Sequence, residues 1–161
     1  MIGSLFPFKN DSRLDYIQRE VVAFIQSPNY HFELPEISPQ LWRQMNSDRS
    51  VAERLEFLGD AIMHSSLADG LNEHFPYEGP GFYTHVRSVL EANSTFAHLM
   101  IKVGSSSADN PVKAAGDIFE SIMAAFHREQ GSDVFGQYFR KYFSDLILRA
   151  GKACKIYQYV I

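Results

Sequence analysis

The sequence lacks most of the features that commit a chain to disulfides, zinc or a membrane. Cys154 is the only cysteine in 161 residues, so the chain cannot form an internal disulfide or a zinc site built from several cysteines. No run of 18 apolar residues occurs, so we expect no membrane span. The opening segment, MIGSLFPFKNDSRL, has the pattern of neither a signal peptide nor a transit peptide. These absences favour an intracellular protein, and they leave the cytoplasm, nucleus and mitochondrion all open.

Internal repeats and low-complexity tracts are also missing, so we expect one domain over residues 1–161. Hydrophobic residues make up 45% of the chain and aromatic residues 14%, which is ordinary for a globular protein with one core. The net charge of −4 opposes nucleic acid as a partner unless a bound cation changes the balance locally.

The spacing of apolar residues predicts an all-α protein, because stretches that alternate apolar and polar residues are scarce. We expect a loop over the Pro- and Gly-rich residues 75–83. The last ten residues, KACKIYQYVI, could form a docked extension or one short strand. Gly131 is expected to end the fifth helix and Gly151 the sixth. The expected helices cover residues 11–27, 37–46, 50–70, 84–102, 112–130 and 133–150.

The predicted helix over residues 50–70 carries three carboxylates on one face. At about 100° per residue, Glu53, Glu56 and Asp60 project within a sector of about 60°. Like charges this close repel, so we expect a positive partner from outside the sequence. Gly59 costs about 1 kcal/mol relative to alanine inside a helix, which indicates a close approach by another helix. The opposite side is an apolar stripe expected to face the core: Val51, Leu55, Leu58 and Ile62.

The predicted helix over residues 112–130 carries a second acidic pair, Asp117 and Glu120, one turn apart. One such pair is usually a solvated face, but two helices packed side by side could bring four carboxylates together. Hard oxygen ligands without Cys or His clusters suit Mg²⁺ or Mn²⁺, and these ions support phosphodiester hydrolysis. The apolar side of this helix is expected to contain Ala115, Ile118, Phe119, Ile122 and Phe126.

Three segments resemble the endonuclease domain of the ribonuclease III family. They are ERLEFLGDAI, VRSVLEANSTFAHL and KAAGDIFESIMAAF, and the last is closer to Dicer-type domains than to bacterial enzymes. The resemblance covers about residues 14–150 and implies the all-α fold of that domain. It also implies that Mg²⁺ or Mn²⁺ is bound by Glu56, Asp60, Asp117 and Glu120.

Further residues of the site follow from the same resemblance. Glu53 matches the first glutamate of the signature, beside the metal cluster, where an outer-shell or RNA-facing role is implied. Lys113 matches a lysine near the scissile phosphate in Dicer-type domains, and the alternative is a surface lysine at a helix start. Arg87 and Asn93 are candidates for RNA contact, with a buried salt bridge as the alternative for Arg87.

Phe57 lies about 40° from Glu53, on the acidic side of its helix, where no core residue is expected. It could be a core aromatic at the edge of the apolar stripe. The resemblance favours a subunit contact, since the family's two-fold dimer has this aromatic at its interface.

The resemblance implies a metal-dependent endoribonuclease that cuts double-stranded RNA as a homodimer, leaving 5′-phosphates, 3′-hydroxyls and short 3′ overhangs. One alternative is a non-catalytic RNA-binding structural protein of the same fold, such as a ribosomal component, which is expected to lack one or more of the four acids. Another is the subunit of a heterodimer. Only ten residues follow Gly151, so we expect no double-stranded RNA-binding domain there, and an accessory RNA-binding protein could supply that function. The segment FPYEGPGFYTHVRS departs from the family's usual polar connection, which leaves its RNA contacts open.

Overall fold

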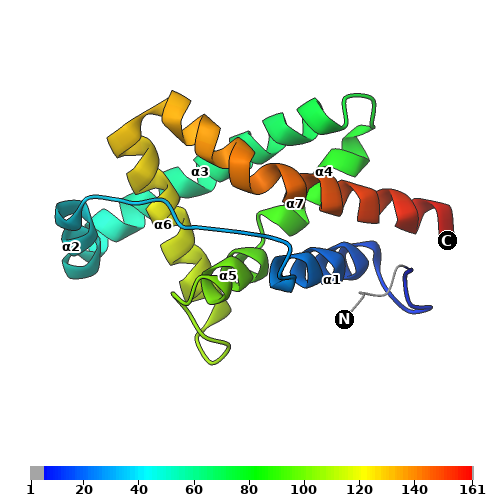
Figure 1. Cartoon of the computed structure of the whole chain (residues 1–161), viewed down its shortest axis with the longest axis horizontal. Coiled ribbons are helices and arrows are strands. Elements are labelled where there is room, and N and C mark those ends of the chain that lie inside the picture. The colour runs from blue at the N-terminus through cyan, green and yellow to red at the C-terminus, as the bar shows by residue number, and fades with distance from the viewer. Residues whose placement is uncertain (1–5, 161) are drawn as a thin grey trace.

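The computed structural model describes residues 6–160, so the expectation about the opening segment concerns in part residues outside this range. The described residues form seven α-helices and no strand, which confirms the all-α class. Figure 1 shows α7 running between α3 and α1, with α2 beside the start of α3. The helices are α1 (Arg13–Gln26), α2 (Pro39–Ser47), α3 (Arg49–His74), α4 (Pro80–Leu90), α5 (Asn93–Lys102), α6 (Val112–Gln130) and α7 (Ser132–Val160).

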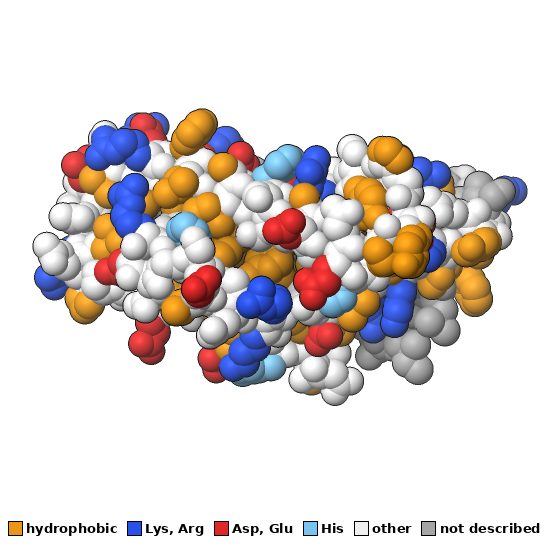
Figure 2. Space-filling view, turned by 90° about the horizontal axis from the view of Figure 1, so that it is seen from above, with side chains coloured by type: hydrophobic (Ala, Val, Ile, Leu, Met, Phe, Trp, Pro, Cys, Tyr) orange, Lys and Arg blue, Asp and Glu red, His pale blue; other side chains and the backbone are white. Residues whose placement is uncertain are grey.

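The surface mixes charges of both signs with exposed hydrophobic side chains. On the face drawn in Figure 2, Lys and Arg side chains are interspersed with Asp and Glu, and no broad basic surface covers that face. Among residues 6–160, no helix combines the length and the apolar character needed to cross a membrane.

Polar caps and one glycine set the ends of several helices. The side chain of Ser38 accepts a hydrogen bond from the backbone N–H of Leu41 at the start of α2. Asp48 likewise accepts hydrogen bonds from the first turn of α3. Gly131 follows α6 with a φ of 87°, which confirms the predicted end of that helix, because glycine adopts positive φ without a steric penalty.

The predicted helix over residues 84–102 is wrong, since two helices occupy this region. The chain turns at Ala92, where ψ is 142°, and the Thr95 hydroxyl donates a 2.6 Å hydrogen bond to the Val89 carbonyl at the end of α4. The predicted loop over residues 75–83 is too long, because α4 already begins at Pro80. Proline suits this position, since the first residue of a helix needs no N–H donor.

The prediction that Gly151 ends the last helix is also wrong. The helix α7 continues to Val160, so residues 152–160 form neither a strand nor a separate extension. A Cβ atom at Gly151 would overlap the ring of Phe75, so this glycine permits close packing. Gly70 has the same role in α3, where a Cβ atom would overlap the side chain of Ile147.

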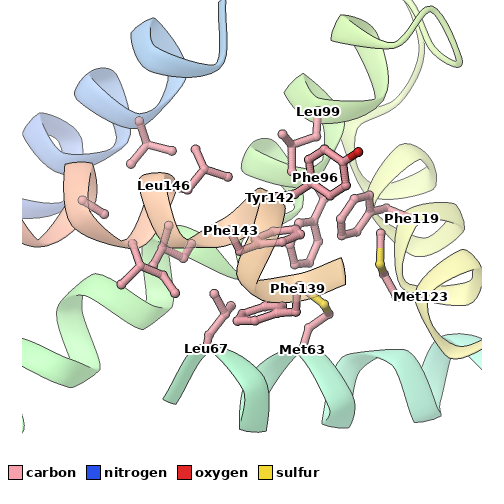
Figure 3. Packing of buried hydrophobic residues seen from close by; sticks show 14 of the residues in the cluster. Met63, Leu67, Phe96, Leu99, Phe119, Met123, Phe139, Tyr142, Phe143 and Leu146 are labelled. Atoms are coloured by element: carbon pink, nitrogen blue, oxygen red, sulfur yellow. The ribbon is translucent and has the colours of Figure 1, made fainter. Parts of the chain in front are cut away.

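The core is built on aromatic rings from α5, α6 and α7 (Figure 3). Phe119 of α6 stacks on Phe96 of α5 with ring centroids 4.4 Å apart. Phe119 also approaches Phe143 of α7, which stacks on Phe139. Because Phe119 is fully buried among these rings, the rotation of α6 about its own axis is fixed.

The buried sides of the two acidic helices differ from the predicted stripes. In α3 the buried side runs through Leu55, Gly59 and Met63, so it is rotated toward Glu56 relative to the predicted stripe. The other three residues of that stripe, Val51, Leu58 and Ile62, are only partly buried. In α6 the predicted core residue Ile118 is 46% exposed. The reason is the direct contact of α3 with α6. Small residues such as Gly59 and Ser121 are buried in this contact, and a search for large apolar side chains does not find them.

Candidate active site

The close approach of α3 to α6 is made possible by Gly59. A Cβ atom at this position would overlap the backbone carbonyl oxygen of Glu120. The approach expected from the glycine is therefore confirmed. Ser121 adds a polar link between the helices, because its hydroxyl lies 3.2 Å from the Ala52 carbonyl oxygen of α3 and 2.9 Å from the Asp117 carbonyl oxygen.

A second glycine brings α5 against α6 at the same place. A Cβ atom at Gly116 would overlap the side-chain amide of Asn93, the first residue of α5. Two glycines thus set how closely α3 and α5 approach the acidic turn of α6. The positions of the acidic side chains depend on both contacts.

These helices enclose an open cavity of about 820 Å³. The four predicted metal ligands all line it, which brings together carboxylates that are about 60 residues apart in the chain. Of the other predicted residues, Glu53, Phe57, Asn93 and Lys113 also line the cavity, whereas Arg87 does not. The complete lining is Arg49, Glu53, Glu56, Phe57, Asp60, Ser88, Glu91, Ala92, Asn93, Lys113, Asp117 and Glu120.

Glu120 is the most perturbed acid of the cavity. Its side chain is buried, and this burial, followed by repulsion from Asp60, Asp117 and Glu56, raises its pKa to about 7. Burial also raises the pKa of Glu56, and the neighbouring Asp117 acts in the same direction. Asp60, Asp117 and Glu56 therefore lie close enough to Glu120 to disfavour its charge.

The chemistry of this donor set fits a hard divalent cation. Carboxylate oxygens are the ligands that Mg²⁺ and Mn²⁺ prefer, and a cation would relieve the repulsion that raises the pKa of Glu120. Within the described residues, no three Asp, Glu, His or Cys side chains are already arranged to hold one metal ion. One oxygen of Asp117 instead accepts a 2.9 Å hydrogen bond from Lys113 Nζ. The fit is thus one of donor chemistry and location.

Each acidic helix carries a cation one turn before an acid of the cavity. Lys113 pairs with Asp117 in α6, and this hydrogen bond raises the pKa of Lys113. In α3, Arg49 Nε donates a 2.7 Å hydrogen bond to Glu53 Oε1. Glu53 is exposed and does not contribute to the pKa shift of Glu120, so it lies at the margin of the acidic group.

The remaining predicted residues differ in their settings. Arg87 is half-buried in α4, and the described part of the chain offers it no salt bridge, so the alternative of a buried ion pair finds no support. Phe57 is 80% exposed at the cavity, which excludes the alternative of a core aromatic. An exposed ring of this size on a polar rim is typical of a surface that another molecule covers.

Sequence reasoning missed three polar residues of the cavity: Arg49, Ser88 and Glu91. Arg49 could have been found from its spacing of four residues from Glu53 on one helix face. Glu91 could not, because it reaches the cavity through the turn between α4 and α5. There its carboxylate lies 2.6 Å from Nδ1 of His64, which links this turn to α3.

The chain is similar in sequence to proteins named Ribonuclease 3. It is 34% identical over 121 residues to that of Mannheimia succiniciproducens, which covers 70% of this chain and 49% of the relative. For that of Mycoplasmopsis synoviae the identity is 24% over 148 residues, which covers 81% of this chain and 64% of the relative. For that of Bacteroides fragilis the identity is 29% over 97 residues, which covers 55% of this chain and 33% of the relative. No family model matches the chain.

The fold and these similarities together define the class of the protein. The described helices are those of an all-α endonuclease domain. The chain contains an endonuclease domain of the ribonuclease III family, as its three motifs indicated. It spans between about a third and two thirds of the length of the three relatives named above.

Proposed function

We propose that the protein is an endoribonuclease that cleaves double-stranded RNA with the help of Mg²⁺ or Mn²⁺. The observation that carries the proposal is the acidic cavity between α3 and α6, where burial and the repulsion of three other carboxylates raise the pKa of Glu120 to about 7. Such a group of acids is costly for the fold, so a role in binding a cation accounts for it better than a structural role does. The names of the relatives support RNA as the substrate.

The residues of the cavity divide the chemistry among them. Glu56, Asp60, Asp117 and Glu120 would hold the divalent ions, which supply an activated water and neutralise charge on the phosphate when bound. Lys113 Nζ lies at the edge of the same cavity, where an ammonium group can stabilise a developing negative charge on a phosphate oxygen. Glu53 and Asn93 flank this centre and can orient the substrate. We propose products with 5′-phosphate and 3′-hydroxyl ends and short 3′ overhangs.

The test is cleavage of a long RNA duplex with and without a divalent ion. In Mg²⁺ or Mn²⁺ the duplex should be cut to short products. Chelation of the ion should abolish cleavage, and readdition of the ion should restore it, because four clustered carboxylates need a cation to bind an anionic phosphate. Product sizes and end groups are read by gel electrophoresis and by sensitivity to a phosphatase. Binding of the duplex without cleavage in either ion would contradict the proposal and favour the non-catalytic RNA-binding alternative.

We further propose that two copies of the chain act together. One cavity cuts one strand, and a two-fold pair places a second cavity at a fixed distance for the other strand. Phe57 is the proposed contact, since its ring is 80% exposed beside the acids.

Replacing Phe57 with alanine is expected to shift the protein toward monomers and to reduce cleavage of both strands. Burial of the ring across an interface would contribute about 1.5–3 kcal/mol per copy. Sedimentation measures the mass, and denaturing gels measure cuts on each labelled strand. Tyr77→Ala is the matched control, because Tyr77 is a 97% exposed aromatic outside the cavity. A monomeric wild-type protein with full double-strand cleavage would eliminate the paired arrangement.

A further inference from the structure

Arg49 is the cation of the cavity that the motifs do not account for. It is the first residue of α3, and its side chain is 91% exposed at the cavity margin. Its Nε atom donates to Glu53, while within residues 6–160 neither of its terminal nitrogens has a hydrogen-bond partner. The planar guanidinium therefore presents free donors at the opening of an acidic cavity.

A structural role explains this arginine poorly. A cation in the first turn is opposed by the positive end of the helix dipole, and α3 has no acidic residue in that turn. The ion pair with Glu53 has the arginine before the glutamate, which is the less favourable order on a helix. Exposed pairs of this kind contribute little to stability. Arg49 thus contributes little to the stability of the folded protein.

The substrate supplies a better reason. The chain has a net charge of −4, and the Lys and Arg side chains that line the cavity are Arg49 and Lys113, so an RNA backbone that enters it meets few cations. Lys113 is the second residue of α6 and Arg49 the first of α3, and both line the cavity that contains the acids. Arginine matches phosphate well because its fork of donors can contact two oxygens at once.

The spacing along α3 says which phosphate is within reach. Arg49 precedes Glu56 by seven residues, which is about 10 Å along the helix axis. Its Nε is hydrogen-bonded to Glu53, one turn before Glu56, so the guanidinium lies beside Glu53 at the margin of the cavity rather than among the four acids. It is placed for a phosphate beside the cleaved bond.

We propose that Arg49 is a substrate-positioning residue that exchanges its contact with Glu53 for a backbone phosphate adjacent to the scissile one. This inference rests on the proposed function and deepens it, because it assigns a specific cation to the binding of the RNA backbone. A phosphate contact carries no sequence information, so Arg49 sets the register of the duplex in the cavity.

Duplex binding in EDTA, where cleavage is prevented, tests the role of Arg49. Fluorescence anisotropy of a labelled RNA duplex is measured over a range of salt concentrations for the wild type, Arg49→Ala and Arg54→Ala. Arg54 is the matched control, since it is an exposed arginine of the same helix that bonds to Ser50 and does not line the cavity. Arg49→Ala should weaken binding about 3- to 10-fold and make the slope of log affinity against log salt about one unit shallower, as for loss of one phosphate contact.

Arg54→Ala should leave both quantities at their wild-type values, and Arg49→Lys should keep the slope while recovering part of the affinity. In Mg²⁺, Arg49→Ala should raise KM more than it lowers kcat. Unchanged binding in Arg49→Ala would overturn the inference, and so would an equal loss in both alanine variants. These affinities are measured without cleavage, so the two proposals can fail separately. A wild type that does not cleave RNA would refute the proposed function, whereas the salt slopes alone decide whether Arg49 binds the RNA backbone.

Discussion

Glu120→Gln is expected to reduce cleavage of duplex RNA by roughly 100-fold or more, since removing even a group that only supports a metal ligand costs 10- to 100-fold. The substitution preserves the shape of the side chain and removes its charge. Helical content should be unchanged, because Glu120 faces the cavity while its neighbour Phe119 holds α6 in the core. Initial cleavage rates and circular dichroism measure the two effects.

Glu73→Gln is the control for Glu120→Gln, because Glu73 is an exposed carboxylate of α3 that does not line the acidic cavity. It should cleave like the wild type. Cleavage by Glu120→Gln at the wild-type rate would refute the assignment of Glu120 as a metal ligand.

The same variant reports on the raised pKa through the stability of the metal-free protein. The pKa of Glu120 rises from 4.5 to about 7 on folding, so between these values the folded state binds more protons than the unfolded state. In EDTA, the unfolding free energy of the wild type should therefore fall relative to that of Glu120→Gln as the pH rises through this range. Urea unfolding at pH 5 and pH 8 measures the difference, and parallel behaviour of the two proteins would contradict it.

Gly59→Ala is expected to damage both the stability and the activity of the protein. The added Cβ atom would overlap a backbone oxygen of α6, which cannot move aside as a flexible side chain could. Overpacking typically costs about 1–3 kcal/mol, and we expect the upper end of this range. For a domain of this size that lowers the melting temperature by roughly 6–12 °C. Separation of α3 from α6 would also move Glu56 and Asp60 away from the acids of α6, so cleavage should fall.

Gly79→Ala is the control for this substitution. Its φ is −83°, and no atom beyond Gly79 and its two chain neighbours lies within 4 Å of the added Cβ, so alanine fits there without strain. Thermal melts and cleavage rates of the two variants separate the effect of close helix packing from that of losing a glycine. A Gly59→Ala protein that melts and cleaves like the wild type would mean that the approach of α3 to α6 is not needed.

Much of the candidate site could be predicted from local sequence because the helical period alone decides which side chains share a face. The spacing of Glu53, Glu56 and Asp60 puts them on one side of α3 whatever that helix packs against. The same holds for Asp117 and Glu120 in α6. The close helix approach at Gly59 could also be predicted, since a glycine inside a long helix is unfavourable unless a close contact compensates for it.

Tertiary packing decided the rest. The break between α4 and α5, which places Glu91 and Asn93 at the cavity, depends on a hydrogen bond of Thr95 and on the seating of Asn93 over Gly116. Gly151 lies inside α7 and packs closely against the ring of Phe75, the residue that caps the C-terminus of α3. These contacts join residues that are distant in the chain, so no local pattern contains them.

The electrostatic character of the site was decided in the same way. The sequence by itself determined which residues are acidic and which helix face they share. Only the packing of α3 against α6 determined that Glu120 is buried and that the other three acids lie close enough to raise its pKa to about 7. The physical reason is that desolvation and repulsion depend on distance in space, and Gly59 and Gly116 set that distance by letting three helices approach more closely than side chains would allow.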